Sequence, residues 1–181
     1  IQLRLGVSQP SVSRLVSRLG AEIIVLGKGP ATRYALTRDV RDLGSDLPVY
    51  RVDEDGNVHV LGHLQTLRDG QYWWVDDSDV GRLYNYLPWF IQDMRPDGFS
   101  GRAFALRQSR ELDLPRRLNE WRDDHVLIAL ARRGEDITGN LIIGDESLER
   151  YLESTRDEQL VVRFDDRAEI YPRLAKAAIE G

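Results

Sequence analysis

The first part of the sequence constrains the fold most, because it contains residues typical of the ends of two successive helices. A short helix end over residues 2–5 runs into a glycine turn. Ser8 then has the chemistry of a helix N-cap, and Pro10 lies in the first turn, where its missing N–H does no harm. Apolar residues follow at helical spacing as far as Leu19, and Gly20 favours a helix end.

A basic hairpin is expected directly after this second helix. The strand-like runs at 23–26 and 32–36 flank a turn rich in glycine at 27–30. The order of helix, turn, helix and hairpin predicts a winged helix-turn-helix over residues 1–38, which we call the head. The chain starts at Ile1, inside the first helical pattern, so we expect a fragment that lacks most of the first helix.

The charge of the chain is distributed unevenly. The head holds six basic side chains and one acid, whereas the remaining residues hold 19 basic and 29 acidic side chains. A basic head on an acidic body indicates that only the head meets a polyanion.

The second helix of the head has the side chains expected of a recognition helix. Such a helix presents short polar and basic residues from its N-terminal half to the major groove. Gln pairs with adenine, Arg with guanine, and Ser contacts phosphates or base edges, while cations on the wing suit phosphates or the minor groove. We therefore expect double-stranded DNA as a partner, against the alternative that the helix packs on another protein. The predicted contact residues are Ser8, Gln9, Ser11, Ser13, Arg14, Ser17, Arg18, Lys28 and Arg33.

A second module is expected after a polar linker over residues 39–46. Alternating runs at 47–52 and 58–64 flank an Asp55-Gly56 turn, which is a strong hairpin signal, and a third strand is expected at 71–75. We name residues 47–181 the lobe.

The rest of the lobe reads as short helices and isolated strands, so the expected fold class is α+β: a winged helix-turn-helix followed by a small mixed α/β lobe. A last helix capped by Asp165 or Asp166 is expected to be interrupted by Pro172. Other helices are predicted at 89–94, 103–107, 124–133 and 146–152, and strands at 140–143 and 161–164.

Familiar catalytic and metal motifs are excluded by spacing. Lys28 lies between two glycines but without P-loop spacing, and Arg102 stands where a nucleophile elbow needs glycine. His59 and His63 belong to one strand pattern, in which four residues span about 13 Å, too far to share a metal. The acids at 76–79 are expected to form a solvated turn. No catalytic and no metal-binding residue is therefore predicted.

Two further groups of residues receive structural interpretations. The four tryptophans (Trp73, Trp74, Trp89 and Trp121) are expected in the core or at its margin. The arginine pairs at 116–117 and 132–133 are expected to form a solvated, salt-bridged face. The chain has no cysteine, which is typical of a reducing cytoplasm, and no apolar run of about 20 residues, so we expect a cytoplasmic protein without a membrane segment.

Residues 47–152 resemble the N-terminal subdomain of HipA-family serine/threonine kinases, the toxin kinases of bacterial toxin–antitoxin systems. The segments that carry the resemblance are 55–64, 87–99 and 123–141. Residues 5–15 are similar to the turn and recognition helix of bacterial winged helix-turn-helix regulators. The whole pattern resembles the YjjJ-like branch, in which a winged helix-turn-helix precedes the kinase.

The resemblance implies a kinase whose catalytic residues lie beyond this lobe. ATP and magnesium are expected for the intact parent and no cofactor for this chain, so its own enzyme activity stays open. The implied partners are DNA, the kinase core or an antitoxin protein, and a second copy of the chain. The alternative is a transcriptional regulator whose lobe senses a ligand or dimerises. A ligand sensor predicts an enclosed pocket, whereas a kinase lobe predicts an open apolar face.

Overall fold

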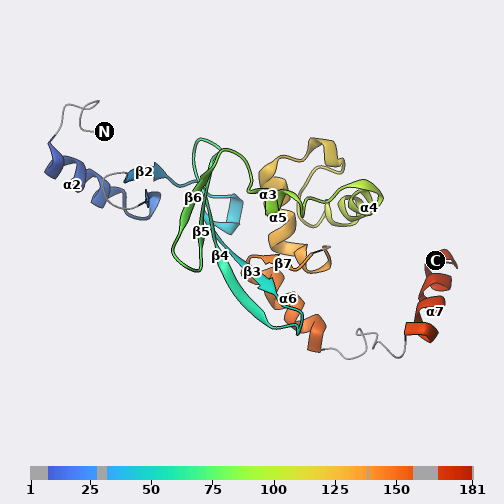
Figure 1. Cartoon of the computed structure of the whole chain (residues 1–181). Coiled ribbons are helices and arrows are strands. Elements are labelled where there is room, and N and C mark those ends of the chain that lie inside the picture. The colour runs from blue at the N-terminus through green and yellow to red at the C-terminus, as the bar shows by residue number, and fades with distance from the viewer. Residues whose placement is uncertain (1–7, 28–31, 138, 157–166, 181) are drawn as a thin grey trace.

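The protein is a mixed α/β molecule built around a five-stranded antiparallel sheet (Figure 1). A computed structural model describes residues 8–27, 32–137, 139–156 and 167–180. The large sheet has the order β6-β5-β4-β3-β7, and a separate two-stranded sheet pairs β1 with β2. The strands are β1 (Ile23–Leu26), β2 (Arg33–Leu36), β3 (Asp46–Val52), β4 (Val58–Thr66), β5 (Tyr72–Asp76), β6 (Gly81–Tyr84) and β7 (Leu141–Ile143).

Helices α3, α4 and α5 lie on one side of the large sheet in Figure 1, and α2 with the β1–β2 hairpin lies at the opposite end of the molecule. Short 3-10 helices connect several elements. The α-helices are α2 (Gln9–Leu19), α3 (Trp89–Gln92), α4 (Gly98–Gln108), α5 (Asp123–Arg133), α6 (Asp145–Arg156) and α7 (Arg167–Glu180). The 3-10 helices are η1 (Gly20–Glu22), η3 (Arg41–Leu43), η4 (Leu118–Glu120) and η5 (Gly134–Asp136).

Helix α5 is the centre of the hydrophobic core. Its residues 126–131 are all buried, as expected of a helix that is apolar around its whole circumference. They belong to one core with inward-facing sheet residues such as Leu64 and Tyr72. Asp123 and Asp124 occupy the first turn of α5, where negative charge is favoured by the helix dipole. Burial of α5 therefore holds the lobe together and fixes the position of these two carboxylates.

The β3–β4 hairpin forms on the predicted Asp-Gly turn. Asp53 accepts hydrogen bonds from the backbone N–H of Asp55 and of Asn57, at 3.0 and 2.8 Å. Further along, the register shifts at a β-bulge between Val49 and Tyr50. Opposite Val49 lies Gly62, where an added Cβ would meet the Val75 carbonyl oxygen at 2.2 Å. Only glycine fits that position without a shift of the sheet.

Most of the elements predicted from the sequence are confirmed, with two differences. Strand β6 was not predicted, because its four residues carry no clear alternation. The predicted interruption at Pro172 is wrong: α7 continues through it. A proline keeps a helical φ and removes one hydrogen bond, and the exposed position of Pro172 lets the helix tolerate that loss. The predictions for 2–5, for 161–164 and for the cap at 165 or 166 lie outside the described residues.

The head and the lobe are joined by backbone hydrogen bonds. Thr37 forms an antiparallel bridge with Leu67, and the Arg68 N–H donates to the Leu36 carbonyl at 3.0 Å. Val40, within the predicted linker, is fully buried in the core. The division at 38/39 and 46/47 stays a prediction, but the segment between them is partly built into the lobe.

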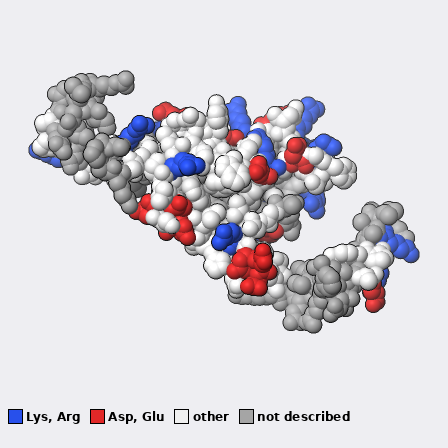
Figure 2. All heavy atoms as spheres, in the orientation of Figure 1, with Lys and Arg blue, Asp and Glu red and all other residues white. Residues whose placement is uncertain are grey.

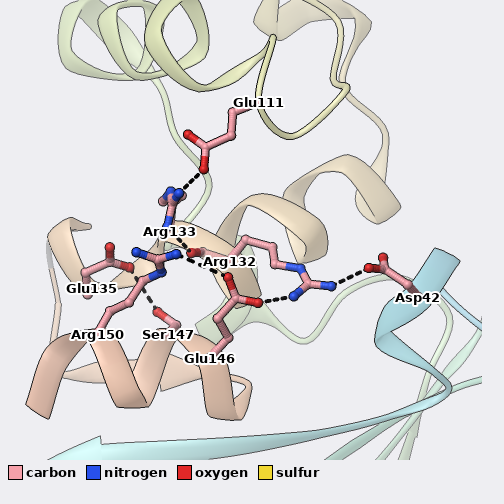
Figure 3. Close-up of polar contacts among 8 residues, drawn as sticks. All are labelled: Asp42, Glu111, Arg132, Arg133, Glu135, Glu146, Ser147 and Arg150. Atoms are coloured by element: carbon pink, nitrogen blue, oxygen red, sulfur yellow. Dashed lines mark hydrogen bonds and ion pairs between the residues drawn. The ribbon is translucent and has the colours of Figure 1, made fainter. Parts of the chain in front are cut away.

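A network of ion pairs fastens α5 to its neighbours (Figure 3). Arg132 pairs with Asp42 of η3 and with Glu146 of α6, and Arg150 lies 3.4 Å from the same Glu146. Arg133 pairs with Glu111, in the segment after α4. The prediction of a salt-bridged face is confirmed for residues 132–133.

Candidate nucleic-acid interface

The candidate recognition helix is α2, and its bounds follow from its cap residues. Ser8 is the N-cap with an extended backbone, and a proline occupies the first turn, as predicted. The Ser8 hydroxyl lies 3.0 Å from the hydroxyl of Ser11, so the cap interacts with a side chain of the first turn. The helix ends at Gly20, whose φ of 51° is in the region that favours glycine. The helix predicted after Gly6-Val7 is therefore present at the predicted place.

Two arginines form the basic surface of α2. Arg14 and Arg18 are four residues apart, so they lie one above the other on the same side of the helix. Both are exposed, as is Ser17, while Ser11 is half-buried. Within the described part of the chain neither arginine has an ion-pair partner. The side of α2 that carries them therefore presents two positive charges to solvent.

The other predicted contact residues lie on α2, on the hairpin that follows it, or outside the described residues. Ser8 is exposed, and Gln9 and Ser13 belong to α2. Arg33 is the exposed first residue of β2 and pairs in register with Leu26 of β1. Lys28 lies outside the described residues. The structure thus brings the serines and arginines of α2 onto one helix and sets Arg33 on the adjoining hairpin, and their contacts with DNA stay a prediction. The complete winged helix-turn-helix also stays a prediction, because residues 1–7 are not described.

The acid of the head is directed away from these arginines. Glu22 pairs with Arg68 of the lobe at 3.3 Å. Arg38, which the charge count includes in the basic head, is also engaged: its guanidinium donates to both carboxylate oxygens of Asp124, at 2.6 and 2.9 Å. The hydrogen bond to Asp124 raises the pKa of Arg38 above its ordinary value. Arg38 therefore links the head to α5 of the lobe. No local sequence signal indicates Asp124 as its partner, because the two residues lie far apart in the chain.

Large apolar side chains of the head are incompletely covered by the described residues. Leu15 and Leu19 of α2 keep 46% and 41% of their surface exposed, and Val25 of β1 keeps 54%. Leu26 is buried, with 5% exposed. The described helix and hairpin therefore leave much of this apolar surface exposed.

The histidines and acids of the lobe form local contacts. His59 Nε2 lies 2.8 Å from Asp53, and His63 Nδ1 lies 3.1 Å from Asp46. The first contact is the main reason that the pKa of Asp53 falls to about 2. Asp76 accepts the N–H groups of Ser78 and Val80, so the predicted solvated turn is confirmed. Among the residues described, no three His, Asp or Glu side chains are grouped as a metal site would need.

Two predictions for the lobe are wrong. Arg116 and Arg117 have no ion pair within the described ranges, because the acids near them in sequence, such as Glu111 and Asp113, face other arginines. Trp74 and Trp121 are buried as expected, but Trp89 is 66% exposed, because α3 turns its buried side chain Ile91 inward.

Comparison with known proteins assigns most of the chain to a family. Residues 43–152 match the sequence profile described as "YjjJ-like toxin, middle domain". "Toxin YjjJ" of Escherichia coli (strain K12) is 32% identical over 191 residues, an alignment that covers the whole of this chain and 40% of that relative. The chain thus spans well under half the length of this curated relative. No solved structure matches this chain. None of the helices in the described ranges is long and apolar enough to cross a membrane.

Proposed function

The chain belongs to the family of YjjJ-like toxins, and from this membership we propose that it is the DNA-binding and regulatory part of a toxin kinase. The proposal has two elements: the head binds double-stranded DNA, and the lobe docks onto a kinase core in another part of the longer protein. The observation that carries it is the pair of exposed arginines on α2, which have no ion-pair partner among the described residues, followed by a hairpin that presents Arg33.

The chemistry of α2 supports DNA binding in the major groove. Arg14 lies near the middle of the helix, within reach of a base edge when the N-terminal half enters the groove, and a guanidinium can donate two hydrogen bonds to guanine. Arg18 is one turn further on and suits a phosphate. Ser8, Ser11 and the helix N-terminus supply further hydrogen-bond donors for the backbone. Gln9, Ser13, Ser17 and Lys28 complete the proposed contact set.

The exposed aromatic residues of the lobe support a docking role. Tyr86, Trp89 and Phe99 are 80%, 66% and 83% exposed, and Leu106 of α4 is 58% exposed. Phe99 and Leu106 are seven residues apart, two turns along one side of α4. Exposed apolar groups that lie together mark protein-interaction surfaces, and Phe99 and Leu106 share one side of α4.

We assign the catalytic centre, ATP and magnesium to the kinase core in the rest of the longer protein. An antitoxin protein and a second copy of the chain are the alternative partners for the exposed residues Tyr86, Trp89 and Phe99. DNA binding would place the protein on the bacterial nucleoid, where the head could regulate transcription.

DNA binding is tested with the full-length protein, a set of genomic duplexes and a salt series. Binding should weaken steeply as salt rises, because phosphate neutralisation releases counterions. Arg14→Ala should lose about 1–3 kcal/mol of binding free energy if Arg14 contacts a base. Arg51→Ala, which removes an exposed arginine of β3, is the matched control and should leave the affinity unchanged. A full-length protein that shifts no duplex even at low salt would refute this part of the proposal.

Docking is tested by amide hydrogen exchange. Segments 86–92 and 99–106 should exchange more slowly in the full-length protein than in the 181-residue chain, because the kinase core would cover them. Segment 53–57, the exposed turn of the β3–β4 hairpin, serves as the control. Equal exchange in both proteins would exclude the kinase core as the occupant, and protection that depends on protein concentration would identify a second copy instead.

A further inference from the structure

Arginines gather at the end of the lobe that carries α4. The part of the chain after position 38 has 19 basic and 29 acidic residues. Within it, residues 95–122 hold seven basic and four acidic residues. This segment is therefore positive within an otherwise acidic lobe. In Figure 2, Lys and Arg atoms lie over this end of the molecule together with some Asp and Glu atoms, and in Figure 1 this end lies opposite α2 and the hairpin. The segment is thus a second basic region, separate from the head.

A hollow of about 570 Å³ lies within this basic region. Its lining includes four arginines from three segments: Arg95 after α3, Arg102 of α4, and Arg116 and Arg117 before η4. Leu106 and Leu118 add apolar surface to the same hollow. Its volume is within the range of about 300–1,000 Å³ that is usual for small-molecule sites.

The four arginines differ in their partners. Arg95 is fixed, since its guanidinium donates to the Trp121 carbonyl and lies 3.8 Å from the Asp123 carboxylate. The guanidinium groups of Arg102, Arg116 and Arg117 have neither an ion pair nor a hydrogen bond within the described ranges. The carboxylate in the lining belongs to Asp97, which caps α4 by accepting the Gly98 N–H at 2.6 Å. Three guanidinium groups therefore line a concave surface that offers them one carboxylate.

We propose that this hollow binds a small molecule bearing a phosphate or diphosphate group. A guanidinium presents a planar fork of donors that matches phosphate oxygens in pairs. A terminal phosphate has three oxygens and up to two negative charges for the three unpaired arginines, whereas a carboxylate has two oxygens and one charge. Leu106 and Leu118 would contact the less polar part of the same ligand.

The test uses the 181-residue chain and isothermal titration calorimetry at about 0.1 M salt, where exposed charges are already screened beyond roughly 10 Å. The probes are pyrophosphate, ADP, adenosine, succinate and a phosphoserine peptide. Pyrophosphate and ADP should bind, ADP more tightly because its nucleoside adds apolar contact, and adenosine and succinate should bind far more weakly.

The variants identify the residues. Arg102→Ala and Arg117→Ala should each weaken ADP binding about tenfold or more, the usual effect of losing a charge-assisted hydrogen bond. Arg117→Lys should recover only part of that loss, because lysine keeps the charge but not the fork. Arg110→Ala removes an exposed arginine of the same region that does not line the hollow, and it should leave binding unchanged. Unaltered thermal unfolding checks that the exposed substitutions leave the fold intact.

Several results would overturn the proposal. If neither pyrophosphate nor ADP binds, the hollow is not a phosphate site. If succinate binds as tightly as pyrophosphate, the site does not select phosphate. If the phosphoserine peptide binds more tightly than ADP, the ligand is a protein segment and not a small molecule. If Arg110→Ala loses as much affinity as Arg117→Ala, binding reflects the general charge of the region. None of these outcomes bears on DNA binding by the head.

Discussion

Helix α2 of the head and helix α5 of the lobe use the same side chain, arginine, in opposite ways. In the lobe, Arg132 and Arg133 are held by carboxylates from other elements and help fasten α5 in place. In the head, Arg14 and Arg18 have no carboxylate partner among the described residues and face solvent. The apolar residues differ in parallel, since those of α5 at positions 126–131 are buried, whereas Leu15 and Leu19 of α2 are nearly half exposed. Partners contributed from distant segments decide whether an arginine holds the fold together or remains available for a ligand.

The largest effect expected from this comparison is on stability. Leu127 of α5 is fully buried, so Leu127→Ala should lower the free energy of unfolding by about 2–5 kcal/mol. Leu15 of α2 is 46% exposed, and Leu15→Ala should cost roughly 1 kcal/mol or less, because little transfer and cavity energy is lost. Urea denaturation followed by circular dichroism measures both. Equal losses would show that α2 is as well packed as α5.

An intermediate effect is expected at the junction of the two regions. A double-mutant cycle with Arg38→Gln and Asp124→Asn should give a coupling energy on the order of 1 kcal/mol, because the pair is bidentate and the Arg38 side chain is only 26% exposed. The Glu22–Arg68 pair joins the same regions but is 65% and 58% exposed, and its coupling should be close to zero. A coupling that is larger for Glu22–Arg68 would contradict this account of the junction.

The smallest effect concerns the hairpin of the lobe. The hydrogen bond from His59, aided by the backbone N–H of Asn57, lowers the pKa of Asp53 from 3.8 to about 2. A lowered pKa means that the folded hairpin favours the charged carboxylate, so this contribution is present above about pH 3.8 and is lost as the pH falls through 2. NMR titration of the Asp53 side chain measures the pKa. His59→Phe should move the pKa back toward its ordinary value, and an unchanged pKa would contradict the assigned cause.

Local signals in the sequence were sufficient for most of the fold. The Asp55-Gly56 turn and its alternating flanks predicted the β3–β4 hairpin, and Ser8 with Gly20 predicted the bounds of α2, because these features act over a few residues. Strand β6 has no such local signal and exists through its pairing with β5. Burial is likewise a tertiary outcome, which is why the exposure of Trp89 was not foreseen.

The candidate interface could be predicted only as a set of residue types. Helical spacing placed Arg14 and Arg18 on one side of α2, but it could not show that Arg38 is engaged by Asp124, 86 residues away. The arginine hollow was missed for a similar reason. Arg102 and Arg117 come from separate segments, and the sequence predicted that Arg116 and Arg117 would be neutralised by nearby acids.

The bridge between Thr37 and Leu67 has a consequence for how the molecule opens. With it, the Arg38 N–H donates to Thr66 and the Arg68 N–H to Leu36, so hydrogen bonds of the larger sheet extend into the base of the hairpin. These two amides should exchange only when the lobe unfolds globally, while amides of α2 exchange through local opening. We therefore expect the cooperative folding unit of the lobe to extend back to about residue 36. If α2 opens locally, the base of the β1–β2 hairpin should stay attached to the large sheet.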